Sequence, residues 1–477
     1  MRPVKAPFMT SKDFRENGKM RVLCLGAALM ALPMALAASE PQVFETRLDN
    51  GLKILVQEDH RAPVVVSQVW YKVGASSEYA GVTGVSHMLE HMMFKGTARH
   101  PAGEFSKIVA ANGGRENAFT SQDYTTYFQM LERSKLPVSL ELEADRMRNV
   151  RFIEAEYEKE HQVVLEERRL RTDDQPHAKL QEHFDAVAYT NSPYRNPVIG
   201  WPDDITHLSL DNVKKWYQLW YAPNNATLVV VGDVRPEDVV REARKHFGSL
   251  KPSVLPKPRV EQEVEQLGLR RLSVKLPAKL PHLLMGFKVP SLRTVQDEKE
   301  AYALEVAAGI LDGGNSARFS KNLVRGQQIA ASTGVGYELY ARLQTLFMIE
   351  GTPSQGQTVE TLETALLNQV KRLQDDPVTA EELQRVKAQV LANHVYQLDS
   401  AFFQAMQLGT AETVGLGWKK IGEYEARINE VTAADIMAAA KKYLIEDRLT
   451  IARLDPLPLP DGAPAPEAPA IGGGHVR

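Results

Sequence analysis

The chain has 477 residues, of which 43% are hydrophobic and 25% are charged. A chain of this length and hydrophobic content can bury a large core, and the length alone predicts roughly two to four domains. The composition therefore excludes a disordered protein. Acidic and basic residues almost cancel, leaving a net charge of -3 at pH 7. Because such a balance forces no strongly basic face, we expect no nucleic-acid partner.

The first residues have the pattern of a secretory signal. A basic start, residues 19–21, precedes an apolar run, residues 22–36, that ends in Ala35-Leu36-Ala37. A basic start, a short apolar segment and a small-residue cleavage site are typical of signal peptides. We therefore predict a signal peptide over residues 1–37, with Met20 as the alternative start, and a periplasmic mature chain. An uncleaved membrane anchor is the alternative interpretation.

Cysteine usage agrees with export. The only cysteine of the sequence, Cys24, lies inside the apolar run of this signal. The mature chain would then contain no thiol, which excludes disulfides and thiol chemistry and fits an oxidising compartment such as the periplasm. No later stretch approaches the roughly 18 apolar residues that a transmembrane helix requires. We therefore expect no membrane span in the mature chain.

The first half of the mature chain alternates strands and helices. Residues 42–58 predict a β-hairpin around Asp49-Asn50-Gly51, and residues 64–73 predict a further strand. The last elements expected in this half are a strand over residues 227–232 and a helix over residues 236–247. A stiff, proline-rich linker follows over residues 251–260. We therefore predict a first domain over residues 43–250.

The second half repeats this order. It predicts a strand (283–289), a helix (298–311), strands within 329–349 and a final strand (449–452). Residues 211–232 and 433–452 also align by eye, since each passage carries a helix, a tyrosine and a strand. A repeat of roughly 200 residues is too long for a solenoid and predicts two duplicated domains that face one another. The second domain is expected over residues 261–455, followed by a disordered tail over residues 456–477.

One apolar segment carries polar residues with metal-ligand spacing. In residues 84–94, His87 and His91 stand four apart on a predicted helix, so both imidazoles can face one ion, with Glu90 on the adjoining edge. The order His-x-x-Glu-His is the inverted form of the common zinc-peptidase motif. Two structural core histidines are the alternative, but each would need its own acceptor in an apolar helix.

A catalytic zinc normally takes three protein ligands and leaves one position for water, so a further ligand is expected. Residues 154–169 form a predicted helix that is rich in glutamate and is interrupted by an apolar patch. For most of these glutamates a solvated charged face is the better interpretation. Glu160 and Glu167 stand seven apart on one face and flank the patch, which makes them the candidates.

With these residues the chain resembles the pitrilysin family, which includes insulysin and the mitochondrial processing peptidases. In that family a glutamate ligand follows the inverted motif about 76 residues on, with an auxiliary glutamate seven residues before it, and Glu167 and Glu160 hold these places. The resemblance implies a zinc metalloendopeptidase with one Zn2+ per chain, bound by His87, His91 and Glu167. It further implies that Glu90 is the general base and that Glu160 supports a histidine ligand. Manganese or cobalt could replace zinc in vitro.

The resemblance covers residues 43–455. It includes the segments Asn117–Thr120 with Asp123–Thr125, Ser192–Pro197, Tyr221–Asn225 and Gly313–Arg318. It implies an α+β fold of two homologous α/β-sandwich domains, each a mixed, mainly antiparallel sheet with helices packed on it, facing each other across a chamber. The chain length is similar to that of the smaller, processing-peptidase-like branch, whose chains work as dimers.

The implied substrates are short or unfolded polypeptides, since two facing domains would exclude folded proteins. A substrate could bind as an added strand along the edge formed by Asn117, Ala118, Phe119 and Thr120, because backbone pairing gives affinity without demanding one sequence. Asn117 and Ala118 are the candidates for the direct contact.

One departure from the family pattern concerns the second domain. Active relatives of this size carry an arginine there and, about 13 residues later, a tyrosine, and both reach the substrate. Arg318 fills the first place, but Ala331 stands in the second, and Tyr337 or Tyr340 would have to substitute from the next strand. We therefore expect the chain to be the metal-bearing subunit of a heterodimer with a homologous partner, a homodimer being the alternative. Two non-catalytic alternatives are a structural or peptide-binding subunit of the same fold and an exported chaperone.

Overall fold

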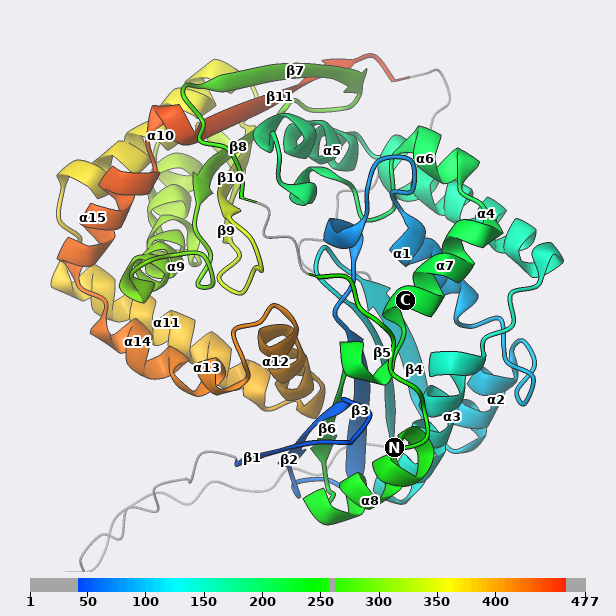
Figure 1. Ribbon diagram of the computed structural model, residues 1–477. Helices are drawn as coiled ribbons and strands as arrows, with labels where there is room; N and C mark the ends of the chain where they lie inside the picture. The colour runs from blue at the N-terminus through cyan, green and yellow to red at the C-terminus, as the bar shows by residue number, and fades with distance from the viewer. Residues whose placement is uncertain (1–41, 258–261, 460–477) are drawn as a thin grey trace, which may run out of the picture. The chain divides into compact units, whose positions relative to one another are not determined.

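A six-stranded sheet occupies the first half of the chain. The computed structural model describes residues 42–257 and 262–459 (Figure 1). The strand order is β1-β2-β6-β3-β5-β4, and all neighbours are antiparallel except β2 and β6. The strands are β1 (Val43–Arg47), β2 (Lys53–Glu58), β3 (Val64–Tyr71), β4 (Arg115–Thr120), β5 (Thr125–Glu132) and β6 (Ala226–Gly232). The predicted signal peptide lies outside the described residues.

The predicted hairpin is confirmed, and its turn joins the sheet to the end of the first half. Gly51 has φ +92°, a left-handed conformation that suits glycine. The Asn50 amide donates to the carbonyls of Phe247 and Leu250 at 2.7 and 3.1 Å, while its oxygen accepts from the Leu52 N–H. The turn therefore fixes the C-terminal end of the helix that precedes the predicted linker.

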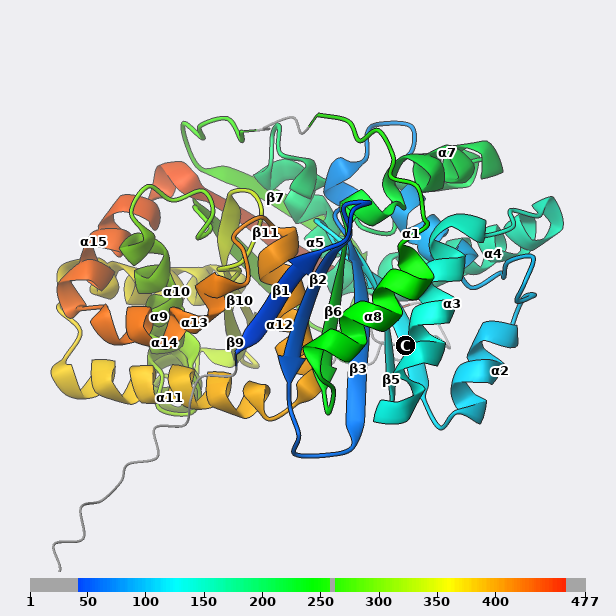
Figure 2. The same ribbon diagram turned by 60° about the horizontal axis from the view of Figure 1, so that its bottom comes forward.

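Eight helices belong to the first half of the described chain. They are α1 (Val85–Met92), α2 (Glu104–Ala111), α3 (Leu136–Asn149), α4 (Glu154–Arg168), α5 (Pro176–Ala188), α6 (Pro202–His207), α7 (Leu210–Trp220) and α8 (Pro236–Phe247). All but α5 pack with the first sheet or on its covering helices. The largest core cluster forms between these helices and one face of the sheet, where Ile54, Val69 and Leu228 are fully buried. In Figure 2, α8 lies across this face.

The second half builds a five-stranded sheet with the order β7-β11-β8-β10-β9. Its strands are β7 (Arg270–Pro277), β8 (His282–Val289), β9 (Ala330–Tyr337), β10 (Thr345–Pro353) and β11 (Leu449–Leu457). Its helices are α9 (Glu298–Asp312), α10 (Val359–Asp375), α11 (Ala380–Leu398), α12 (Ala401–Thr413), α13 (Lys419–Gly422), α14 (Tyr424–Glu430) and α15 (Ala433–Tyr443). Neighbouring strands are again antiparallel except for one parallel pair, β7 and β11.

The expected duplication is visible in the two strand orders. If β2 is matched with β7 and β6 with β11, the remaining strands follow in the same sequence, and the parallel pair falls at the same place. The helices before β6 and β11 also begin alike, with capping boxes at Ser209–Asn212 and Thr432–Asp435. The predicted α+β fold with mixed, mainly antiparallel sheets is therefore confirmed.

Two details of the sequence prediction are corrected. Strand β7 was not predicted, although its residues alternate between half-buried and exposed positions. The final strand was predicted to end at Ala452, and the disordered tail to begin at Pro456. β11 runs to Leu457 because its backbone pairs with β7 as far as Pro277. The rest of the tail, residues 460–477, lies outside the described residues.

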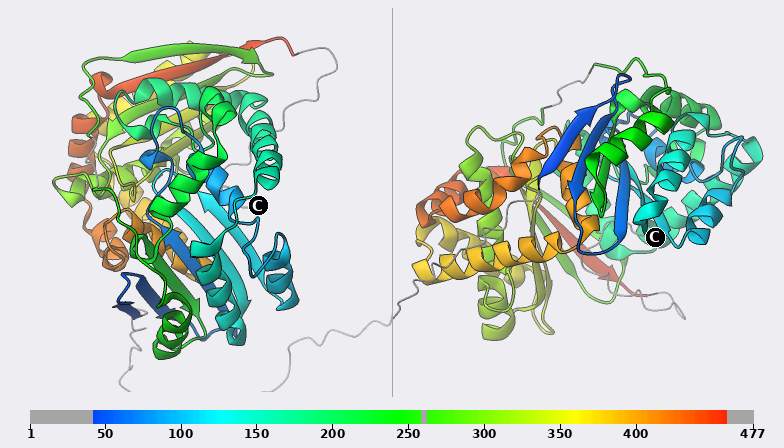
Figure 3. Two further views of the ribbon diagram at one scale, coloured as in Figure 1. Left: turned by 45° about the vertical axis from the view of Figure 1, so that its right-hand side comes forward. Right: turned by 90° about the horizontal axis from the view of Figure 1, so that it is seen from below.

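Each half contributes a helix to the sheet of the other half. α12 packs on the face of the first sheet opposite α8, where Ala405 and Leu408 contact Trp70, Val229 and neighbouring apolar residues (Figure 2). α5 packs on β7, β8 and β11, as Figures 1 and 3 show. There Leu180 and Phe184 are buried against residues of the second sheet such as Leu284 and Leu454. The two halves are therefore joined by buried apolar contacts as well as by the chain.

Within the two described ranges, no helix combines the length and the apolar character needed to cross a membrane. Residues 250–257 contain no helix or strand. The exact domain boundaries and the linker at 251–260 remain predictions.

Candidate metal centre and active site

α1 presents the inverted motif at the wall of a cavity. The helix begins after Gly84, whose φ of +88° and close approach to the Ile199 carbonyl leave no room for a side chain. The Glu78 carboxylate accepts hydrogen bonds from the N–H groups of Gly84 and Ser86, both at 2.7 Å. It thereby satisfies two donors at the N-terminus of the helix. Burial nevertheless raises the pKa of Glu78 to about 8.

The apolar residues of α1 anchor it in the core of the first half. Met88, Leu89 and Met92 are buried there. His87 and His91 lie on the side of the helix that faces α4, and their ring centroids are 4.8 Å apart. The four-residue spacing has therefore brought both imidazoles to one side, as predicted.

Glu167 of α4 completes a group of three ligating atoms. Its Oε2 atom lies 3.2 Å from His91 Nε2 and 3.9 Å from His87 Nε2, and the ligating atoms of the three residues lie within 4.8 Å of one another. Around a tetrahedral zinc with bonds of about 2.0–2.1 Å, two ligand atoms would be about 3.3 Å apart. Two imidazoles and one carboxylate at this spacing fit one zinc ion and leave a fourth position for water.

Glu160 holds His91 from the opposite side of the ring. Glu160 Oε2 lies 3.1 Å from His91 Nδ1, and Lys95 Nζ lies 2.5 Å from Glu160 Oε1. Burial alone would raise the pKa of Glu160, but the bonds to His91 and Lys95 outweigh it and lower the pKa. An ionised Glu160 keeps the proton on Nδ1, so the Nε2 lone pair of His91 faces the ligand group.

The burial along α4 follows from this arrangement. Glu167 is 9% exposed, whereas Glu154, Glu158 and Glu166 are exposed to solvent. Glu160 is half-buried. Glu156 is half-buried as well, so burial distinguishes Glu167 from the other glutamates of the helix, whereas Glu160 is distinguished by its contact with His91.

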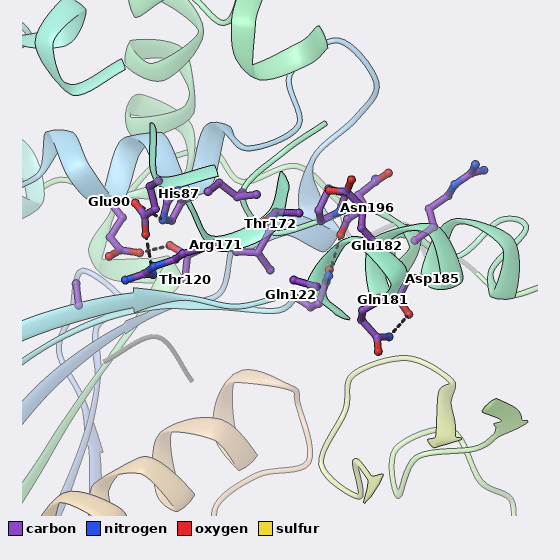
Figure 4. Close-up of a pocket in the computed structure, with 17 residues that line it drawn as sticks. His87, Glu90, Thr120, Gln122, Arg171, Thr172, Gln181, Glu182, Asp185 and Asn196 are labelled. Carbon is purple, nitrogen blue, oxygen red and sulfur yellow. Dashed lines mark hydrogen bonds and ion pairs between the residues drawn. The ribbon is translucent and has the colours of Figure 1, made fainter. Parts of the chain in front are cut away.

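Glu90 is oriented by a residue of the first sheet. The Thr120 hydroxyl donates to Glu90 Oε2 across 2.6 Å, at the end of β4. Both residues line a cavity of about 290 Å³ together with His87, Glu167 and Ala118 (Figure 4). The cavity therefore brings the general-base candidate, the ligand group and the edge strand together.

The predicted substrate strand is the outer strand of its sheet. β4 pairs with β5 alone among the described strands, so its other edge faces the α1 side. Asn117 Oδ1 accepts a hydrogen bond from the N–H of Ala118 at 2.9 Å. Phe119 instead points to the opposite face and packs edge-on against Trp70. Of the four predicted residues, Ala118 and Thr120 line the cavity.

Arg318 is held elsewhere in the structure. Its guanidinium forms two hydrogen bonds with the Glu382 carboxylate, at 3.0 and 2.8 Å, and it is not among the residues that line the metal-site cavity. Ala331 lies in β9, which ends at Tyr337. The prediction that Tyr337 and Tyr340 lie on the strand after Ala331 is wrong, because Tyr337 ends the same strand and Tyr340 lies beyond it.

Sequence reasoning missed Arg171. It lies in η3 (Arg169–Asp173), a stretch of π-helix after α4, and its guanidinium is 2.7 Å from Glu167 Oε1. Figure 4 shows Arg171 beside His87, Glu90 and Thr120. Its position four residues after Glu167 was the available signal, since such residues share a helix face.

The far end of the cavity is formed by α5. Gln181, Glu182 and Asp185 line it there, at some distance from the ligand group in Figure 4. Glu182 pairs with the buried Arg168 at 2.9 Å. Burial raises the pKa of Asp185 to about 7. The cavity thus continues from the metal centre to the helix that packs on the second sheet.

Comparisons with known proteins agree with this site. Residues 53–201 match the insulinase family, peptidase family M16, and residues 207–390 match the domain described as the peptidase M16 inactive domain. The zinc protease PqqE of Helicobacter pylori is 32% identical over 421 residues, covering 87% of this chain and 93% of that relative.

Solved structures give the same result. The crystal structure of a protease from Helicobacter pylori has a TM-score of 0.82 at 31% identity and covers 87% of this chain and 100% of that chain. The periplasmic protease PqqL from Escherichia coli has a TM-score of 0.73 at 18% identity and covers 92% of this chain but 52% of that chain, a likeness in fold alone. The chain therefore belongs to peptidase family M16, the pitrilysin family that its sequence resembles.

Proposed function

We propose that this protein is an exported zinc metalloendopeptidase that hydrolyses short or unfolded polypeptides. The observation that carries the proposal is the convergence of His87, His91 and Glu167 on one side of the cavity, with Glu90 beside them. Non-catalytic chains of the same fold would have no need of this complete set. The curated relative from Helicobacter pylori is named a zinc protease, which supports the same activity.

The mechanism follows from the placement of the side chains. When bound by His87, His91 and Glu167, zinc would lower the pKa of a water molecule and polarise the scissile carbonyl. Glu90 would take the proton from the attacking water and then give it to the nitrogen of the leaving amine. Thr120 would hold the Glu90 carboxylate in position for both transfers, and Glu160 would keep His91 in the ligating tautomer.

The substrate would bind along the open edge of β4. An added strand there would place its backbone beside Ala118 and within reach of Glu90. The N–H of Ala118 now donates to the Asn117 side chain, so a substrate carbonyl would have to replace that acceptor. Phe119 would support the strand from the opposite face. A direct contact from Arg318 would require it to leave Glu382.

We further propose that the active enzyme is a heterodimer with a homologous partner. Ala331 offers no hydroxyl where the family has a tyrosine, and Arg318 is bound to Glu382. A partner would then supply an arginine and a tyrosine to the substrate. This chain matches about half of PqqL, which is consistent with two such units acting together. A homodimer remains the second possibility for the assembly.

Export to the periplasm is part of the proposal. It rests on the predicted signal over residues 1–37 and on the position of Cys24 within it. PqqL, a relative in fold, is described as periplasmic. N-terminal sequencing of the protein from the periplasmic fraction should begin at or near Ala38. An intact N-terminus in the cytoplasmic fraction would contradict export.

Metal content and peptidase activity of the mature chain test the function directly. We expect one zinc per chain, with hydrolysis of unfolded peptides when the chain is mixed with a homologous partner. Glu90→Gln should keep the zinc and lose activity, whereas Glu167→Gln should lose the zinc. Peptide binding without products, by the unaltered chain in every mixture, would instead indicate a binding subunit or chaperone. Ordinary turnover by the chain alone would refute the heterodimer.

A further inference from the structure

A second cavity lies in the second half of the chain, outside the metal site. Its volume is about 400 Å³, and it is lined by residues of α9, α11, α12, α13, α14, the end of β9 and the segment that follows β9. Its walls carry two carboxylates, Glu305 and Glu338, and three tyrosines, Tyr337, Tyr340 and Tyr424. No lysine or arginine is among the described residues that line it. The cavity is therefore rich in hydrogen-bond acceptors and has no positive charge of its own.

Two acceptors of this cavity are weakly paired or unpaired. The Glu305 carboxylate accepts from the Tyr424 hydroxyl at 3.3 Å. The Oε1 atom of Gln407 is buried without a hydrogen-bond partner, while its amide nitrogen lies 3.4 Å from His394 Nδ1. A buried polar atom without a partner costs free energy, so a ligand that donates hydrogen bonds would be stabilised here.

The walls of the cavity desolvate these two carboxylates, although each accepts a hydrogen bond, Glu305 from the Tyr424 hydroxyl and Glu338 from the backbone N–H of Tyr340. This desolvation, with a smaller contribution from the nearby Glu338, raises the pKa of Glu305 to about 7. Desolvation likewise raises the pKa of Glu338, although the residue as a whole is exposed to solvent. A cation between them would favour the ionised forms of both groups.

The remaining walls select the kind of cation. Tyrosine rings attract ammonium and guanidinium groups through their faces. Val390, Leu339 and Met406 line the same cavity and would cover an alkyl stem. A metal ion fits this cavity less well. Among the described residues, three ligating side chains come close enough to bind one ion only at His87, His91 and Glu167, and Glu305 and Glu338 are not part of such a group. The chemistry therefore favours the long side chain of lysine or arginine.

A chain of contacts connects this cavity with the edge strand of the metal site. Thr410 lines the cavity, and its side chain interacts with the Tyr124 hydroxyl. The Tyr124 ring packs edge-on against Phe119 of β4, with the ring centroids 6.1 Å apart. The next residue of β4, Thr120, bonds Glu90. A polypeptide that leaves the edge of β4 past Phe119 would therefore come close to the cavity.

We propose that this cavity is a second substrate subsite, which takes a lysine or arginine side chain of the polypeptide bound along β4. The subsite would anchor the substrate at a distance from the scissile bond, so it would act on affinity and not on the chemical step. The inference rests on the proposed peptidase function where it predicts enzyme kinetics, but measurements of peptide binding test it independently of that function.

The test uses two labelled peptides that differ at one position, lysine in the first and norleucine in the second. Each is titrated against the Glu90→Gln chain, which should not cleave them, and fluorescence anisotropy gives the affinity. We expect the lysine peptide to bind at least about tenfold more tightly, the size of one desolvated charged contact. The double variant Glu305→Gln with Glu338→Gln should remove this preference. The matched control, Glu381→Gln with Glu446→Gln, changes the net charge equally at exposed sites and should keep it.

The outcomes separate this inference from the proposed function. Equal affinity for the two peptides overturns the subsite, as does a preference that the matched control also loses. In turnover assays, the double cavity variant should raise KM for the lysine peptide and leave kcat unchanged. Hydrolysis of both peptides with equal KM would support the peptidase function and overturn the subsite. If neither peptide is cleaved but the tighter binding of the lysine peptide depends on Glu305 and Glu338, the subsite is supported and the peptidase function is contradicted.

Discussion

The Thr120 hydroxyl donates a 2.6 Å hydrogen bond to the Glu90 carboxylate, which joins the edge of the first sheet to the helix that carries both histidines. Thr120→Val keeps the shape of the buried side chain but removes this bond. A hydrogen bond to a charged group contributes about 1.5–3 kcal/mol, so we expect kcat to fall roughly 10- to 100-fold while zinc content stays at one per chain. Steady-state kinetics and metal analysis measure the two quantities.

Thr120→Ser is the matched control, because it keeps the hydroxyl and should retain most of the activity. If the valine variant lost its zinc, Thr120 would be supporting the ligand group and not the general base. An unchanged kcat would mean that Glu90 is oriented without this bond.

The contact between Glu160 and His91 should act on metal affinity. Glu160→Gln removes the charge that keeps the proton on His91 Nδ1, so the ring would be less firmly held in the ligating tautomer. Loss of such a supporting group typically lowers metal affinity about 10- to 100-fold. Competition with a zinc chelator measures the change.

Glu166→Gln is the control on the same helix, since Glu166 is exposed and pairs with Arg169 on the surface. Its zinc affinity should equal that of the unaltered chain. The same loss in both variants would indicate a general effect of charge on α4, and no loss in Glu160→Gln would exclude the supporting role.

The local pattern of the sequence was enough to predict that His87, His91 and a glutamate of the later helix come together. The spacing of His87 and His91, and of Glu160 and Glu167, is set by the helical period, which the sequence carries directly. The partners of these residues from other elements were not predictable in this way. Thr120 reaches Glu90 from a strand 30 residues on, and this contact depends on how β4 pairs with β5.

The contacts within and between the two halves were likewise not predictable from the sequence. Strand β8 was predicted from its apolar run, but β7 was missed because none of its residues is fully buried and its pairing with β11 spans most of the second half. Arg318 was predicted to bind the substrate, and this role stays a prediction. Its ion pair with Glu382 depends on the packing of α11, which the single sequence does not reveal. Neither did the sequence indicate that α5 and α12 each cover the sheet of the other half.

The packing of α12 on the first sheet depends on Gly409. A Cβ atom at this position would lie 2.0 Å from Cε2 of Trp70, which is fully buried. Gly409→Ala should therefore push α12 off the sheet and lower the free energy of unfolding by about 1–3 kcal/mol, as overpacking usually does. Thermal and urea denaturation measure the loss.

Gly336→Ala is the control, because a Cβ atom there would meet nothing within 4 Å. We expect it to unfold like the unaltered chain. Equal stability of both variants would show that α12 can shift without cost, and the contact with Trp70 would then contribute little to joining the halves.

The packing of α5 on the second sheet should weaken in acid. His177 of α5 stacks on His282 of β8 with the ring centroids 4.3 Å apart, and His282 Nε2 lies 3.5 Å from the Glu350 carboxylate. Burial and the neighbouring His282 lower the pKa of His177 below its ordinary value of 6.5, although Glu350 opposes this shift. At pH values between this lowered pKa and about 6.5, His177 is protonated in the unfolded chain but not in the folded chain. The free energy of unfolding therefore falls as the pH decreases below about 6.5.

His177→Phe keeps a ring in the stack but removes the titrating group. The variant should therefore lose less stability than the unaltered chain between pH 7 and pH 5, while at pH 8 the two should differ little. Urea denaturation at each pH gives the comparison, and His207→Phe, at an exposed position, is the control that should leave the acid sensitivity unchanged. If the free energy of unfolding of the His177 variant changed with pH in parallel with that of the unaltered chain, the histidine pair would not make the packing of α5 sensitive to pH. The reason is that only a group whose pKa differs between the folded and unfolded states changes the slope of stability against pH.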